Sequence, residues 1–224
     1  MPMLDIFVGA RFNTCNSGPV EVVEVINHRG VSVRFIETGW ITKTTSKLLR
    51  LGTLKDLMQR TYLGVGFIGD GRHRAVIGKK KTLAYTKWGS MLTRCYSEKY
   101  QNKFPAYKGC TVIPDWHNFQ NFAEWLELHY PKDGGDYDLD KDFKLQGNRV
   151  YGPTTCVFIR KSTNVALANK SKAKSCKLIN PDGLVVSREK VTDFVSEFGL
   201  NCGGIWRVQK VRGAKHKGWS GIHD

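Results

Sequence analysis

The sequence predicts an α+β chain made of several small modules. In the first 54 residues, apolar and polar side chains alternate in short runs, as they do in half-buried β-strands. In two stretches, residues 83–95 and 118–130, apolar side chains recur with the spacing of one face of a helix. A turn signal and further helical spacing follow in residues 173–224. We therefore expect four segments, with boundaries at 1–54, 55–83, 84–172 and 173–224.

The first segment, 1–54, reads as a small β-barrel-like module of SH3-like size. Two strand-like runs, Val20–Asn27 and Val31–Glu37, flank the sequence Asn-His-Arg-Gly, which suits a hairpin loop with glycine at its end. Further strands are expected at Gly9–Phe12 and Gly39–Thr44. Four or five short strands supply little core, so a binding or spacer role is expected for this module rather than catalysis.

The second segment, 55–83, is rich in glycine and in positive charge. It holds the basic residues Arg72, Arg74, Lys79, Lys80 and Lys81. Such a segment between two apolar-patterned blocks is typical of a linker that follows a phosphate backbone. A solvated loop whose lysines only favour solubility explains the pattern equally well.

The third segment, 84–172, opens with two predicted helices. Leu83, Trp88, Met91, Leu92 and Cys95 form one apolar face, and a second helix is expected from Asn118 to Tyr130. Asp115 is a plausible cap for this second helix. The aromatic residues here are expected to be core rather than base-stacking groups; they are Trp88, Trp116, Phe119, Phe122 and Trp125.

The fourth segment, 173–224, reads as a hairpin followed by two helices. Asn180–Gly183 is a strong turn signal between two short apolar runs. Ser187 is expected to cap a helix that ends at Gly199, and a second helix is expected over Ile205–Val211. The pair resembles a helix-turn-helix, whose second helix reads a DNA groove. Candidate DNA contacts are Arg207, Gln209, Lys210, Arg212, Lys215 and Lys217, although a solvated helix face would have the same composition.

The overall charge indicates a polyanionic partner. The chain of 224 residues has 35 Lys and Arg against 20 Asp and Glu, a formal net charge of +15. Double-stranded DNA is the partner that we expect, bound by a monomer. The six cysteines form no Cys-x-x-Cys pair, and no Cys and His quartet is apparent, so we expect reduced thiols, no structural zinc and a cytoplasmic location. No apolar run has the length of a membrane helix and no secretory leader is recognisable, so no membrane association is expected.

An acidic cluster stands out against this basic background. Asp138, Asp140 and Asp142 lie close together after the second predicted helix. Taken alone, the cluster is explained most simply as an exposed acidic turn. Carboxylates are, however, also the ligands that divalent cations such as Mg²⁺ prefer.

The sequence around this cluster resembles the HNH-type homing endonucleases encoded by bacteriophages, with a modular C-terminal DNA-binding tail. The resemblance is carried by Tyr137–Asp142, Tyr151–Phe158 and Asn164, and also by Trp88–Tyr96, Tyr107–Val112 and the tail from Asn180 to Trp219. It covers residues 84–219 and extends more loosely, through the glycine-rich segment and Gly39, to the N-terminal block. It implies a central ββα-metal domain that hydrolyses DNA phosphodiester bonds with one Mg²⁺ or Mn²⁺ ion, by nicking or by double-strand cleavage. It further implies that Asp140 and Asn164 hold the ion and that Arg160 or Lys161 contacts phosphate. A phage-encoded enzyme of this kind would act in the cytoplasm of the host cell.

Two positions depart from the family pattern. Lys141 stands where the best-known members have a histidine general base, and Thr155 stands where they have an asparagine that braces the metal loop. Asp142 could act as an alternative base or second ligand, and Lys141 could act only with a strongly lowered pKa. These departures leave open a catalytically degenerate DNA-binding or regulatory protein on the same fold. An RNA- or ribosome-associated protein is a further alternative, which the acidic cluster disfavours.

Overall fold

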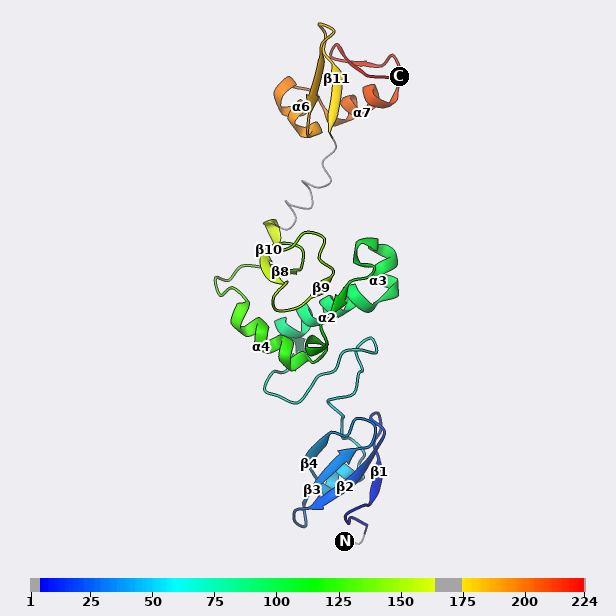
Figure 1. Ribbon diagram of the computed structural model, residues 1–224, viewed down its shortest axis with the longest axis vertical. Helices are drawn as coiled ribbons and strands as arrows, with labels where there is room; N and C mark the ends of the chain where they lie inside the picture. Colours follow the sequence, from blue (N-terminus) through cyan, green and yellow to red (C-terminus); the bar gives the residue numbers. More distant parts are fainter. Residues whose placement is uncertain (1–4, 164–174, 224) are drawn as a thin grey trace. The chain divides into compact units, whose positions relative to one another are not determined.

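A computed structural model describes residues 5–163 and 175–223 of the chain. The architecture is mixed α/β with several small sheets, and it divides into two compact units, Met1–Ile159 and Arg160–Asp224 (Figure 1). Three separate hydrophobic clusters lie within these units. Within the described ranges, no helix has the length and apolar character needed to cross a membrane.

The N-terminal residues form an antiparallel sheet of four strands in sequential order. The strands are β1 (Arg11–Asn13), β2 (Pro19–Val25), β3 (Gly30–Phe35) and β4 (Ile41–Thr45), and the short helix α1 (Ser46–Arg50) follows. The predicted hairpin between β2 and β3 is confirmed, and the Asn27 side chain accepts hydrogen bonds from the amides of Arg29 and Gly30 at 2.9 Å each. The sheet is not a closed barrel, because β1 and β4 are its two edges and do not pair with each other in the described residues.

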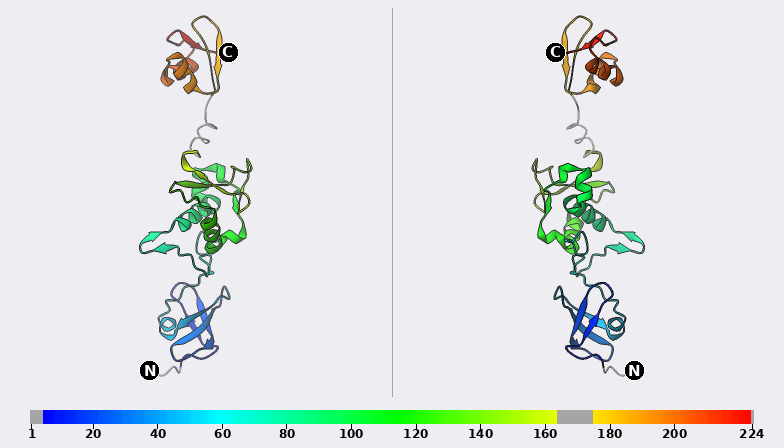
Figure 2. Two further views of the ribbon diagram at one scale, coloured as in Figure 1. Left: turned by 90° about the vertical axis from the view of Figure 1, so that its left-hand side faces the viewer. Right: turned by 90° about the vertical axis from the view of Figure 1, so that its right-hand side faces the viewer.

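The glycine-rich segment that follows contacts the central core along much of its length. Tyr62, Val65, Ile68 and Ala75 pack against the central hydrophobic cluster. A Cβ at Gly66 would lie 2.5 Å from Leu92, so the glycine permits this close approach. Beyond it, β5 (Val76–Ile77) and β6 (Lys80–Lys81) form a small hairpin that stands out from the central helices (Figure 2).

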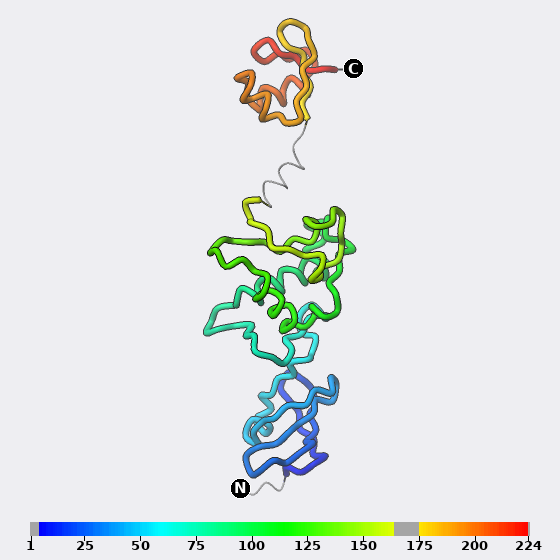
Figure 3. Tube along the Cα trace, turned by 60° about the vertical axis from the view of Figure 1, so that its left-hand side comes forward, coloured from blue at the N-terminus to red at the C-terminus, as the bar shows by residue number. Residues whose placement is uncertain are grey.

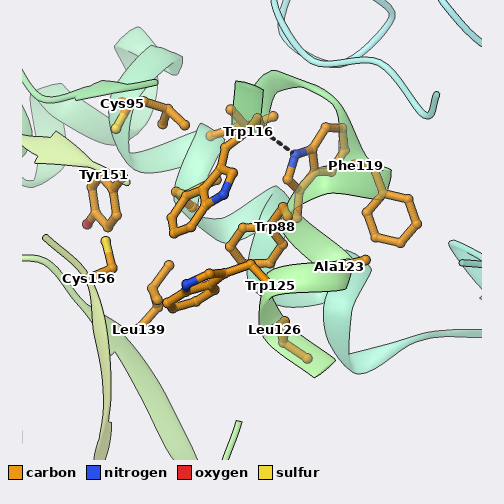
Figure 4. Close-up of a cluster of buried hydrophobic side chains, with 14 of the residues drawn as sticks. Trp88, Cys95, Trp116, Phe119, Ala123, Trp125, Leu126, Leu139, Tyr151 and Cys156 are labelled. Atoms are coloured by element: carbon orange, nitrogen blue, oxygen red, sulfur yellow. Dashed lines mark hydrogen bonds between the residues drawn. The ribbon is translucent and has the colours of Figure 1, made fainter. Parts of the chain in front are cut away.

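The central core is built from two helices and the short elements between and after them. These are α2 (Leu83–Tyr96), α3 (Glu98–Lys103), η1 (Pro105–Tyr107), β7 (Thr111–Val112), η2 (Pro114–His117), α4 (Phe119–His129), β8 (Tyr137–Asp140), β9 (Val150–Tyr151) and β10 (Val157–Arg160). Strand β7 pairs with β9 in parallel, and β8 pairs with β10. The five aromatic residues predicted as core are all buried, and the Trp88 indole donates to the carbonyl of Trp116 at 2.8 Å (Figure 4).

Local capping signals fix where the two long helices begin. The Thr82 side chain accepts from the Tyr85 amide at the start of α2, and the Asn118 side chain accepts from the Gln120 amide at the start of α4. The expectation that Asp115 caps the second helix is wrong, because Asp115 lies in the preceding turn η2.

Within residues 175–223, the C-terminal unit combines two hairpins with two helices. Its elements are β11 (Cys176–Ile179), β12 (Val185–Arg188), α6 (Val191–Phe198), α7 (Cys202–Lys210), β13 (Lys215–His216) and β14 (Trp219–Gly221). The predicted hairpin and both helices are present, and Gly199 ends α6 with a φ of 59°. Ser187 lies in β12 and does not cap α6. The second hairpin folds back so that β14 pairs with β11 (Figure 3).

Substitutions at two glycines of α7 test how closely this helix packs against His216. A Cβ at Gly204 would lie 2.4 Å from the His216 ring, whereas a Cβ at the neighbouring Gly203 would meet nothing closer than 3.5 Å. We expect Gly204→Ala to destabilise the unit by roughly 1–3 kcal/mol, because overpacking forces the ring or the helix to move. Gly203→Ala should leave stability unchanged or slightly raised, because alanine favours helix. Hydrogen exchange of the α7 amides measures both changes, and equal effects of the two substitutions would contradict this packing.

Candidate functional site

Two members of the predicted acidic cluster, Asp138 and Asp140, lie on the outward face of β8, and Asp142 follows the strand. Residues alternate between the two faces of a strand, and here Tyr137 and Leu139 point into the core with exposed fractions of 7% and 4%. Asp138 and Asp140 therefore share the opposite face, where both are partly exposed. The neighbouring strand β10 is fixed by Phe158, whose ring packs 5.3 Å from Trp125 and 4.9 Å from Tyr130.

The three carboxylates differ in their partners. Asp138 forms an ion pair with Lys87 at 3.3 Å, and Asp142 forms one with Lys141 at 2.7 Å. Asp140 has no ion pair within residues 5–163 and 175–223; its Oδ1 accepts from the amides of Asp142 and Phe143 at 2.7 Å each. Its Oδ2 has no hydrogen-bond donor in the same ranges. Asp140 is therefore the carboxylate of this face whose charge no described side chain neutralises.

Lys141 is buried, with an exposed fraction of 6%, and its contacts hold a loop closed. Its Nζ donates to the Asp142 carboxylate at 2.7 Å and to the carbonyl of Asn148 at 2.6 Å, and it lies 6.0 Å from the centre of the Tyr151 ring. In return, the Asn148 side chain donates to the carbonyls of Lys141 and Val150 at 2.9 and 2.8 Å. These bonds join the two ends of the loop between β8 and β9.

Thr155 braces the next loop. Its hydroxyl lies 2.8 Å from the carbonyl of Val150 and 3.2 Å from that of Gly152, to which it donates. The residue that replaces the expected asparagine therefore still cross-links the segment between β9 and β10, although with a shorter side chain.

The remaining predicted residues of this site lie at the end of β10 and beyond it. Arg160 is the last residue of that strand, and Lys161 follows it in a helical conformation. Asn164, expected as the second metal ligand, lies outside the described residues. Whether it approaches Asp140 therefore stays a prediction.

Two buried thiols lie in the core beneath this face. Burial raises the pKa of Cys156 to about 11 and that of Cys95 to about 12. Both thiols are therefore protonated at neutral pH, and neither can serve as a thiolate nucleophile or a ready metal ligand. All six cysteines are free, and Cys15 and Cys202 are the exposed ones.

Some of the predicted DNA-binding residues are bonded to other groups of the protein, and the others are exposed. Arg72 donates to the carboxylates of Glu124 and Glu127 at 2.9 and 2.6 Å. Lys217 donates to the carbonyl of Gly199 at 2.7 Å, and the Gln209 amide contacts the Cys176 sulfur at 3.5 Å. The other candidates of the hairpin and the tail are exposed; these are Arg74, Lys79, Lys80, Lys81, Arg207, Lys210, Arg212 and Lys215.

The structure also brings together a second set of ligand-type side chains, which the sequence analysis missed. Atoms of His73, Glu124 and Glu127 lie within 4.8 Å of one another. The spacing of the two glutamates, three residues apart on α4, was a partial signal, but His73 is about fifty residues away in the sequence. Hydrogen bonds from His73 and Arg72 lower the pKa of Glu124. Because the Arg72 guanidinium already bridges both carboxylates, this cluster is an ion-pair network that fastens the glycine-rich segment to α4.

Comparison with known proteins gives a distant structural likeness. No protein-family model and no curated protein matches the chain. A solved structure of the HNH homing endonuclease I-HmuI, described for its DNA binding and cleavage, is similar to 44% of this chain and 65% of that chain, with 19% identity and a TM-score of 0.23. The match thus spans slightly less than two thirds of that protein.

The contacts of Lys141 predict a structural effect of its removal. Lys141→Met should lower the free energy of unfolding by roughly 1–3 kcal/mol, because it leaves the Asn148 carbonyl and the Asp142 carboxylate without their donor. Lys144→Met, which removes an exposed lysine of the same loop, should change it by less than about 0.5 kcal/mol. Denaturant unfolding measures both. Equal stability of the two variants would show that Lys141 does not hold the loop.

The thiol environments predict a reactivity order. At pH 8 an alkylating reagent should modify Cys15 and Cys202 in the folded protein, because they are exposed. Cys95 and Cys156 should react only after unfolding, because burial blocks access and their raised pKa values keep them protonated. Mass spectrometry of peptides after timed labelling gives the order. Early labelling of Cys156 would contradict it.

Proposed function

We propose that this chain is a metal-dependent DNA endonuclease, with Asp140 as the residue that binds the cation. The observation that carries the proposal is the unpaired Asp140 carboxylate at the end of β8, beside a strand that leads into helical residues. A strand-end carboxylate followed by a helix that supplies a second oxygen or nitrogen ligand is the arrangement that one-metal phosphodiester hydrolysis needs.

The chemistry of the donor atoms fits a hard divalent cation. The Asp140 Oδ1 is held by two backbone amides, and this fixes the carboxylate while leaving Oδ2 available. Carboxylate oxygen is preferred by Mg²⁺ and Mn²⁺, and Asn164 is the second ligand in the proposal. A bound ion would stabilise the negative charge that develops on phosphate during hydrolysis.

The basic side chains around the molecule suit a duplex DNA substrate. Lys79, Lys80 and Lys81 lie on or beside the exposed β5–β6 hairpin. Arg160 ends β10, the strand that pairs with β8, and Lys161 follows it. In the C-terminal unit, Arg207 and Lys210 lie on exposed positions of α7. Contacts from these residues to phosphates would provide affinity without sequence selectivity.

A second function is favoured by the contacts of Lys141. Its Nζ donates to the Asp142 carboxylate and to the Asn148 carbonyl, and these bonds hold the loop between β8 and β9. A charged ammonium has no lone pair, so it cannot act as a general base. Without a base at this position, the same fold would bind DNA without cutting it. Asp142 is the remaining candidate base, although its carboxylate is paired with Lys141 in the structure.

Cleavage assays on matched aspartate variants test the proposal. Asp140→Asn keeps the size of the side chain but removes the charge that attracts the ion, so the rate of plasmid cleavage in Mg²⁺ or Mn²⁺ should fall by about 100-fold or more. Asp138→Asn, on the same face but ion-paired with Lys87, should reduce the rate by less than about tenfold. Asn164→Ala should behave like Asp140→Asn.

The outcomes separate the two functions. Wild type that cuts DNA only with added metal, with loss of cutting in Asp140→Asn, supports the nuclease. Wild type that binds duplex DNA tightly and never cuts it in either metal supports the non-catalytic protein. Equal cleavage by wild type and Asp140→Asn would reject Asp140 as the metal ligand.

A further inference from the structure

A cavity of about 630 Å³ opens in the N-terminal module, far in sequence from the acidic face of β8. It lies where the β2–β3 loop meets the end of β4 and the start of α1. The backbone joins these segments directly, since Gly30 pairs with Thr45 and the Ser46 amide donates to the Arg29 carbonyl at 2.9 Å. Its walls include His28, Arg29, Thr45, Ser46, Lys47 and Arg50.

The basic side chains of this cavity exceed their acidic partners. Arg50 is held by Asp5 through two bonds of 2.6 and 3.0 Å. Arg29 and Lys47 have no ion pair in the part of the chain that the structure describes. Like charges that converge on one cavity repel one another, and an anion between them would relieve that repulsion. Most of the exposed lining of the cavity is apolar, so the preference for an anionic occupant comes from the unpaired Arg29 and Lys47.

A buried hydroxyl supplies a second, independent observation. Ser46 is 6% exposed and lines the cavity, and its Oγ has no hydrogen-bond partner within residues 5–163 and 175–223. A buried hydroxyl without a partner is unfavourable, because it has lost its water without gaining a replacement. The adjacent Thr45 differs, since its hydroxyl accepts from the Leu48 amide at 3.2 Å. The Oγ itself has less than 1 Å² of accessible surface, so it would donate to an anion in the cavity only after the Ser46 side chain rotates.

We propose that this cavity binds a phosphate group of a nucleic-acid backbone. A phosphate presents several oxygens at once, which suits a guanidinium, an ammonium and a hydroxyl that approach from different segments. The inference rests on the proposed DNA substrate and adds a second anchoring point, on a module that carries no part of the nuclease chemistry. It gives the N-terminal sheet a function in holding DNA.

The test measures DNA binding by the full chain at several salt concentrations. Each neutralised phosphate contributes about one unit to the slope of log affinity against log salt, so Arg29→Gln/Lys47→Gln, which empties a site for one phosphate, should lower the slope by roughly 1 between about 50 and 200 mM salt. Lys43→Gln/Lys55→Gln is the matched control, because it removes the same charge from two exposed lysines of this module that do not line the cavity and have no ion pair in the described residues. The control should bind with a slope close to wild type. Fluorescence anisotropy with a short labelled duplex, in EDTA to prevent cleavage, measures all three.

A titration with inorganic phosphate separates the cavity from the rest of the DNA interface. Amide resonances of Ser46 and Lys47 should shift saturably in wild type and in the control, and not in Arg29→Gln/Lys47→Gln. Ser46→Ala, which keeps every charge, should weaken the phosphate response several-fold. The same spectra verify that the fold of each variant is intact.

The outcomes distinguish this inference from the nuclease proposal. Wild type that cuts DNA, with cavity and control variants of equal slope, overturns the inference alone. A reduced slope in the cavity variant with no cleavage by wild type supports the inference and rejects the nuclease. A saturable phosphate response without any change in the DNA slope overturns the nucleic-acid backbone as the source of the phosphate.

Discussion

The buried aromatic layer between α2 and α4 is the constraint on which the acidic face depends. The bond from the Trp88 indole to the Trp116 carbonyl, at 2.8 Å, satisfies two polar groups inside an apolar core. The Phe158 ring packs 5.3 Å from the Trp125 ring. This contact fixes β10 and, through strand pairing, β8. Leu139 packs into that core, and successive residues of a strand point to opposite faces, so Asp140 must point outward. Core packing therefore determines where the carboxylates are presented.

Ion pairing then makes these carboxylates chemically different. Lys87 neutralises Asp138 and Lys141 neutralises Asp142, so that both acids are stabilised by structural partners. Asp140 is stabilised instead by two backbone amides of its own loop, which hold the group without cancelling its charge. A neighbouring ammonium would repel a metal ion and compete with it for the carboxylate oxygens. A backbone amide competes much less, because it carries no net charge. The backbone turn after β8 thus keeps one carboxylate suited to a metal.

Turns and helix ends could be predicted, because they depend on residues that are close in the sequence. Contacts between residues that are far apart in the sequence could not be predicted. The Asn27 turn, the helix that begins after Asn118 and the stop at Gly199 each depend on residues within a few positions, so they were predictable. The hairpin of β13 and β14 was missed because strands of two or three residues carry no alternation. The network of Arg72 with Glu124 was also missed, since nothing local links residues so far apart. Asp140 was found as a candidate, but its lack of a cationic partner required the coordinates.

The basic side chains of the chain also differ in whether they have an acidic partner. Lys87, Lys141 and Arg72 belong to internal pairs, as does Arg188, which is bonded to Glu197 at 2.6 Å. A polyanion gains little from such groups, because each would have to leave a partner that already stabilises it. The cations that can attract DNA are those without acidic partners in the described residues, among them Lys79 and Lys80 of the exposed hairpin and Arg29 and Lys47 of the N-terminal cavity. Affinity for DNA should therefore follow these unpaired side chains rather than the net charge of +15.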